Sequence, residues 1–286
     1  MMKIALLTLL ASGCHASLYS SKSIRPVAAF IPRGGSLGPI EQDLAVKVYG
    51  GIQFVQGLVQ TLSPSTHCDI YGIADAADGS SCNRKLLRQQ GIATLQQGIM
   101  AYLLFSKELS NEEAGGIASL AVVAERLSSL LNEDSKTTGP AKWVDTLTLA
   151  SAGATAVAGI GGLGWATLAL KVTGACHVLL CGLPLMAGAD HMVDNVLECK
   201  GTNAVTASVA RGLGWAMAST GALLAGLAWG ASTATSFGAS MVVTAVSAAK
   251  YLLTDEKDDK LGTNKAAVVA WAIVPAVLAA AVFMDE

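Results

Sequence analysis

Leu44-Ala45-Val46-Lys47-Val48 near the start of the chain and Leu168-Ala169-Leu170-Lys171-Val172 in its second half agree at four of five positions, 124 residues apart. Later matches follow in the same order: Arg88, Gly91 and Gly98 lie opposite Arg211, Gly214 and Gly221 at an offset of 123, and Leu130-Leu131 lies opposite Leu252-Leu253 at 122. Small insertions in the loops explain the change of the offset from 124 to 122. Ordered matches over this length predict one unit that was duplicated and fused.

The chain contains few charged residues. Its 286 residues are 52% hydrophobic and 14% charged, whereas an ordinary soluble domain is about 25% charged. Residues 212–249 and 266–284 carry no charge, and Lys171 is the only charged residue within 146–189. Each interval can hold a helix of about 20 residues that crosses a bilayer. The composition therefore predicts a membrane protein whose partners are lipid and other membrane proteins, while a net charge of −2 without a basic stripe gives no basis for nucleic-acid binding.

Turn signals divide the chain into two sets of four helices. We expect these helices near residues 44–62, 86–105, 114–131, 144–160, 167–186, 207–229, 232–253 and 265–283. Because each set has an even number of spans, both sets enter the membrane from the same side. The predicted fold is an all-α membrane protein with about eight transmembrane helices, arranged as two tandem four-helix repeats in parallel orientation over residues 42–162 and 164–284.

The N-terminus has the layout of a targeting sequence. Residues 1–16 hold a lone Lys3 and an apolar run, which is typical of a signal peptide, and residues 17–35 form a serine-rich, acid-free segment typical of a transit peptide. The stretch Ala28-Ala29-Phe30-Ile31-Pro32 resembles the Ala-Phe-x-Pro junction in plastid presequences of diatoms and related algae. This resemblance implies a plastid membrane, thylakoid or envelope. The alternative is the endoplasmic reticulum or plasma membrane, reached by the secretory route.

Polar residues inside the predicted helices are candidates for a site. Gln53 and Gln56 share one helix face, and Glu125 and His177 lie within apolar helices, where ionisable groups are site candidates by default. These residues either line a polar cavity or form hydrogen bonds between helices. Glu125 and Arg126 are adjacent in sequence and point to different faces, which argues against a simple ion pair between them.

Several polar residues recur in both halves. His67 and His191 form a candidate loop pair at an offset of 124 that could bind a metal or sense pH; the alternative is two exposed histidines inherited from the duplication. The matched cations Lys47, Lys171, Arg88 and Arg211 are candidate contacts for lipid phosphate or an anionic substrate, or they extend to the membrane interface. Cys68 and Cys82 share the first long loop and are a candidate disulfide.

The sequence gives no indication of an enzyme, and it identifies no cofactor or metal site. Residues 159–164 match the spelling G-x-G-x-x-G, but neither strand-helix alternation nor a following acid accompanies them. No nucleophile triad, His-Glu-x-x-His helix or Walker loop is present. The chemistry of a known active site is therefore not predicted.

Two functions fit these patterns. Each four-helix unit resembles small DoxX-like membrane proteins in length and helix count, with a lysine in the first helix and Arg-Gly near the start of the second, and this resemblance implies only a fold. The first hypothesis is a structural or accessory role, as a subunit or assembly factor of a plastid membrane complex. The alternative is a carrier for a small solute with its site between the repeats. Convergence of Gln53, Glu125 and His177 on one cavity would favour the carrier.

Overall fold

The structure is a computed structural model that describes residues 41–71, 81–131, 142–197, 204–254 and 264–284. All regular secondary structure in these ranges is helical, which confirms the predicted all-α class. The first half contains α2 (Gln42–Leu62), α3 (Pro64–Tyr71), α4 (Ser81–Ser106), α5 (Asn111–Leu131) and α6 (Lys142–Ile160). The second half contains α7 (Ala166–Ala175), η3 (Cys176–Gly182), α8 (Leu183–Ala187), α9 (Ala189–His191), η4 (Met192–Val196), α10 (Ala204–Ala228), α11 (Thr233–Thr254) and α12 (Lys265–Met284).

The helix that was predicted near residues 167–186 is continuous but not uniform. It runs as α7, then as the π-helical segment η3, then as α8. Pro184 lies in the first turn of α8 and has no N–H to donate to a carbonyl one turn earlier. The π-helical turns accommodate an additional residue just before this proline.

Within the described ranges, four helices are long and apolar enough to cross a membrane: α5, the continuous helix Ala166–Ala187, α11 and α12. The predicted helix near residues 44–62 is present as α2, but glutamines in its middle reduce its apolar character. Length and composition thus support a membrane-associated helical protein and establish four candidate spans rather than the expected eight.

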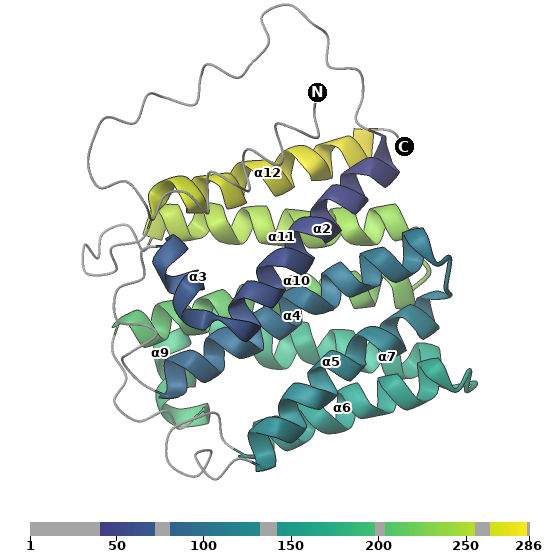
Figure 1. The fold of residues 1–286 in the computed structure, drawn as a ribbon, viewed down its shortest axis with the longest axis horizontal. Coiled ribbons are helices and arrows are strands. Elements are labelled where there is room, and N and C mark those ends of the chain that lie inside the picture. Colours follow the sequence, from purple (N-terminus) through teal and green to yellow (C-terminus); the bar gives the residue numbers. More distant parts are fainter. Residues whose placement is uncertain (1–40, 72–80, 132–141, 198–203, 255–263, 285–286) are drawn as a thin grey trace, which may run out of the picture.

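The helices pack in pairs around a central contact between α4 and α10 (Figure 1). In the first half α2 packs against α4 and α5 against α6; in the second, the continuous helix packs against α10 and α11 against α12. The start of α2 and the end of α12 lie at one end of the bundle, and α3 and α9 lie at the other. We call the latter the α3 end.

Two apolar clusters hold the bundle together. One fills the end opposite α3 and includes Tyr49, Met100, Leu224, Phe237 and Leu278. The other lies toward the α3 end, and its members include Leu86, Leu185, Val193 and Leu213. Burial of such side chains supplies most of the favourable free energy of packing where they leave water. The two clusters thus lie toward opposite ends of the bundle.

Candidate functional site

A cavity of about 130 Å³ lies between α2, α3, α4, α10, α11 and α12. Its polar and aromatic lining residues are Gln53, Gln56, His67, Tyr71, Gln90, Thr94, Gln97, Ser208, Trp215, Ser219, Thr244, Tyr251 and Trp271. Small or apolar residues such as Gly212, Ala216 and Val268 complete the wall. The cavity is thus built from both halves of the chain.

The cavity extends from the α3 end to the middle of the bundle, where a hydrogen-bonded network forms its floor. Tyr49 donates its hydroxyl to Gln97 Oε1 at 3.1 Å and shares a 2.9 Å hydrogen bond with the hydroxyl of Thr244. Ser219 and Ser240 join the same network through their hydroxyls, 2.7 Å apart. Beyond this floor lies the apolar cluster around Tyr49 and Phe237, so the cavity is closed on that side.

Most polar groups of the wall already have partners. Tyr71 donates to Gln56 Oε1 at 3.1 Å and accepts a hydrogen bond from the indole N–H of Trp271. Gln53 is different: its side chain is 3% exposed, and its amide lines the cavity without a hydrogen bond to any described residue. A buried amide normally has a partner, so Gln53 is a group in this cavity whose partner is missing, and the half-buried Gln90 amide also makes no hydrogen bond to the described residues.

The cavity wall carries no charge. None of its described lining residues is Asp, Glu, Lys or Arg. His67 is buried, stacks on Tyr71 with ring centroids 4.4 Å apart and accepts from the Gln60 amide at 3.3 Å. Burial lowers the pKa of His67 to about 4 and raises the pKa of Tyr71 to about 12. Both rings are therefore neutral near pH 7.

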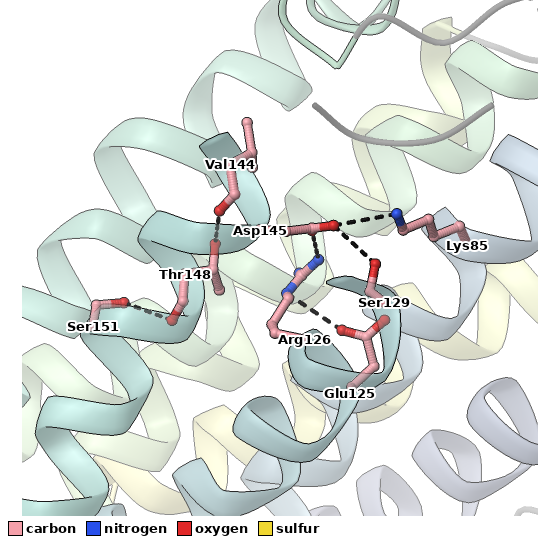
Figure 2. A network of polar contacts seen from close by, with 8 residues as sticks. All are labelled: Lys85, Glu125, Arg126, Ser129, Val144, Asp145, Thr148 and Ser151. Carbon is pink, nitrogen blue, oxygen red and sulfur yellow. Dashed lines mark hydrogen bonds and ion pairs between the residues drawn. The ribbon is translucent and has the colours of Figure 1, made fainter. Parts of the chain in front are cut away.

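The buried charges lie elsewhere, in a cluster around Asp145 (Figure 2). The Asp145 carboxylate is 2.7 Å from Arg126 Nη1, 3.2 Å from Lys85 Nζ and accepts a hydrogen bond from Ser129 at 2.8 Å. Arg126 Nε also lies 3.3 Å from Glu125 Oε2. The expectation that Glu125 and Arg126 would not pair is wrong, because the long arginine side chain folds back toward its neighbour while its Nη1 reaches α6.

His177 does not join the cavity either. It is buried in η3, and its Nδ1 donates to the carbonyl of Thr173 at 2.8 Å within the same helix. Gln53 and Gln56 line the cavity, whereas Glu125 belongs to the charge cluster. Gln53, Glu125 and His177, whose convergence would favour a carrier, therefore lie in three different places and do not converge.

The predicted histidine pair is not a pair of loop residues. His67 lies in helix α3 and is buried, while His191 ends α9 and is exposed. Asn195 contacts His191 one turn later in the chain, whereas His67 is held by Gln60 and Tyr71. The two rings thus have different environments. The described residues also contain no group of three His, Cys, Asp or Glu side chains that could hold a metal.

The matched cations divide into two kinds. Lys47 Nζ lies 5.8 Å from the centre of the Phe105 ring, and Lys171 Nζ lies 5.9 Å from the centre of the Trp229 ring. These are cation–π distances, and Phe105 and Trp229 are themselves 124 residues apart. Arg88 is exposed, and Arg211 Nη2 lies 3.8 Å from an Asp190 carboxylate oxygen.

The predicted Cys68–Cys82 disulfide is wrong. Cys68 carries a buried thiol, while Cys82 is disulfide-bonded. Both residues lie in helices rather than in the loop where the sequence placed them: Cys68 in α3 and Cys82 at the start of α4. The targeting segments of residues 1–16 and 17–35 lie outside the described residues.

Sequence reasoning missed the aromatic wall and the centre of the charge cluster. Tyr71, Trp215, Tyr251 and Trp271 line the cavity, yet each belongs to a different helix. Asp145 did give a signal, since it is the only charged residue between Trp143 and Leu170. An isolated acid in a long apolar segment indicates a buried partner.

Comparisons of the chain with protein families, curated proteins and solved structures give no match. The geometry of the cavity and of the charge cluster is therefore the basis for a function.

Proposed function

We propose that this chain is an integral membrane protein that carries a small uncharged solute through a site between its two halves. The observation that carries the proposal is the uncharged cavity built from α2, α3 and α4 on one side and α10, α11 and α12 on the other. Gln53 is buried there without a protein partner among the described residues. A purely structural or accessory role does not explain a buried amide that has no hydrogen-bond partner, so the cavity favours the carrier.

The close contacts of glycines support a tandem repeat over residues 42–162 and 164–284. A Cβ atom added to Gly57 would lie 2.5 Å from Leu95 N, and one added to Gly182 would lie 2.8 Å from Ala218 Cβ. Leu95 and Ala218 are 123 residues apart. Gln97 and Thr220, also 123 apart, contact each other with a 2.9 Å hydrogen bond. Contacts between equivalent residues are expected where a two-fold axis relates two halves. Eight spans in parallel orientation are part of this proposal.

The same glycine contacts set the register between the halves. Gly98 approaches Phe54, and Gly221 approaches Val178, so Phe54 corresponds to Val178 at an offset of 124. Gly57 and Gly182, however, differ by 125. The π-helical segment η3 lies at this point and holds the extra residue. On this register the counterpart of His67 is Met192 and not His191.

This register makes the charge cluster the counterpart of the cavity. Gly116 and Gly238 approach their partner helices, α6 and α12, at an offset of 122. Gly116 approaches Ile160 and Gly238 approaches Phe283, which gives an offset of 123 for α6. With 123 also for α4 and 122 for α5, the residues Lys85, Arg126, Ser129 and Asp145 correspond to Ser208, Ala248, Tyr251 and Val268. All four of these counterparts line the cavity. The duplication thus supplied two equivalent sites, of which one is open and the other is filled by an ion cluster.

A carrier exposes its site to each side of the membrane in turn, and this can be tested without knowledge of the solute. Thr244 lines the floor of the cavity, so we expect the variant Thr244→Cys to react with a membrane-impermeant thiol reagent added to either face of sealed vesicles. Labelling is measured above that of the unmodified chain. Ser247→Cys on the same helix is the matched control, because Ser247 is fully buried and does not line the cavity.

Each result bears on the proposal. Labelling of Thr244→Cys from both faces, with Ser247→Cys inert, supports a carrier. Labelling from one face alone overturns transport and leaves a fixed binding pocket. No labelling from either face overturns the aqueous cavity and favours the structural or accessory role.

The plastid location is a separate proposal that rests on the presequence resemblance at Phe30. We expect the full chain, fused at its C-terminus to a fluorescent protein, to accumulate in a plastid membrane, and we expect Phe30→Ala to abolish that signal in microscopy. Signal in the endoplasmic reticulum or plasma membrane that does not respond to Phe30→Ala would contradict plastid import and support the secretory route.

A further inference from the structure

We infer that the cavity takes an uncharged molecule with a single six-membered ring, largely apolar, that carries on one edge a group able both to donate and to accept a hydrogen bond. The inference rests on the proposed function, since it names the class of solute for that site. Four features of the cavity carry it: its size, its charge, its aromatic walls and its few unpaired polar groups.

The size of the cavity corresponds to one ring. Its volume is about 130 Å³, and an engineered protein cavity of about 150 Å³ binds benzene. A single water molecule needs only about 10–15 Å³ on this measure, so the space is larger than a hydration site.

The lack of charge excludes ionised ligands. A charged group that enters a buried site without a counter-ion loses its hydration and gains no opposite charge in return, which strongly disfavours binding. Among the described residues no carboxylate, ammonium or guanidinium lines the cavity. Among the lining residues, His67 is the side chain that could become cationic, and its ring contacts the Gln60 amide and the Tyr71 ring.

Aromatic side chains shape the walls. Trp215 and Tyr251 form an edge-to-face pair with ring centroids 5.4 Å apart and an interplanar angle of 88°. The Trp271 indole and the Tyr71 ring are fixed by the hydrogen bond between them, and Tyr71 is fixed further by Gln56. Preorganised aromatic faces favour a flat ring, because aromatic rings attract each other in edge-to-face or offset arrangements in addition to the burial of area.

The unpaired polar groups lie on few residues. The hydroxyls of Ser219 and Thr244 are used in the floor network, and the Tyr71 hydroxyl is bonded to Gln56. The side-chain amides of Gln53 and Gln90 make no hydrogen bond to the described residues. An amide offers both donors and an acceptor, so a carboxamide or hydroxyl at the ring edge would complement it.

Four ring compounds of similar size test this class: benzamide, benzoate, benzylammonium and toluene. We expect benzamide to bind the full-length protein in lipid nanodiscs and the two ions not to bind, in equilibrium dialysis with radiolabelled compounds. Toluene is expected to bind more weakly than benzamide after correction for its partition into empty nanodiscs. The pKa of His67 is about 4, so its ring stays neutral between pH 6 and 8, and binding of benzamide should not change over that range.

Two glutamine variants locate the binding. Gln53→Leu removes the amide that lacks a partner, and we expect it to weaken benzamide binding about 3–10-fold, the range of one neutral hydrogen bond. Gln96→Leu is the matched control, since Gln96 is equally buried and bonds Ser119 outside the cavity. Its binding of benzamide should equal that of the unmodified protein.

The outcomes separate this inference from the proposed function. Binding of benzoate or benzylammonium as tight as that of benzamide, or no binding of any ring, overturns the ligand class. The carrier still stands in that case if Thr244→Cys is labelled from both faces. Equal loss in Gln53→Leu and Gln96→Leu overturns the assignment of the polar edge to Gln53. Failure of Thr244→Cys labelling, by contrast, overturns the proposed function itself.

Discussion

Asp145→Ala is expected to lower the free energy of unfolding by about 3–5 kcal/mol, the cost of removing one partner from a buried ion pair. Asp145 is 1% exposed, and its carboxylate is the shared partner of Arg126 and Lys85. Without it, the guanidinium of Arg126 remains buried beside Glu125 alone. Chemical denaturation of the protein in detergent micelles, followed by circular dichroism, measures the change.

Asp190→Ala is the matched control for this prediction. The Asp190 side chain is 77% exposed and lies 3.8 Å from Arg211, so its loss should cost less than about 1 kcal/mol. The second half of the chain also suggests a charge-free version of the cluster. We expect the quadruple variant Lys85→Ser, Glu125→Ser, Arg126→Ala and Asp145→Val to recover much of the lost stability, because removal of the whole ion cluster, Glu125 included, avoids an unpaired charge. Equal effects of Asp145→Ala and Asp190→Ala would contradict a buried cluster.

The helices could be predicted from the sequence because their signals are local. The break at residues 161–165, for example, contains Gly162, which adopts a positive φ of 59° that favours glycine. The expected helix near residues 144–160 accordingly ends at Ile160 in the structure. A turn of this kind depends only on neighbouring residues, so a pattern of glycines suffices to locate it.

The cavity could be predicted only in part. The spacing of Gln53 and Gln56 on one face of α2 indicated a polar wall, and both residues line the cavity. Tyr251 and Trp271 also line it but come from α11 and α12. Their position in the cavity wall depends on which helices pack together, and the periodicity of a single helix does not contain that information.

On the register that we propose for the two halves, the pairing of His67 with His191 fails for a specific physical reason. A constant offset of 124 pairs them in the sequence. The π-helical segment η3 adds a residue within a continuous helix, so no loop or gap signals the change of register. The residues that flank η3, Ala175 and Leu183, both keep α-helical backbone angles, so the helix continues without a break on either side of the segment. An insertion of this kind is invisible to a turn-based alignment.

The second large effect is expected at the contact between α2 and α4. A Cβ on Gly57 would lie 2.5 Å from the backbone nitrogen of Leu95, and backbone atoms of a packed helix cannot rotate away. Gly57→Ala should therefore lower the free energy of unfolding by about 1–3 kcal/mol, the range for overpacking. Gly51→Ala on the same helix has no atom within 4 Å of its new Cβ and should raise that free energy by up to about 1 kcal/mol through helix propensity.

Gly182→Ala extends this prediction to the second half and tests the duplication in energetic terms. Its new Cβ would lie 2.8 Å from Ala218 Cβ and 2.9 Å from Ala218 N in α10. If the two helix contacts are equivalent, the losses at Gly57 and Gly182 agree within about 0.5 kcal/mol and add in the double variant, as they do for distant, independent sites. A loss at Gly57 with none at Gly182 would contradict the equivalence. It would mean that the π-helical turns of η3 let the second helix shift and absorb the methyl group, and that the two halves differ in rigidity as well as in charge.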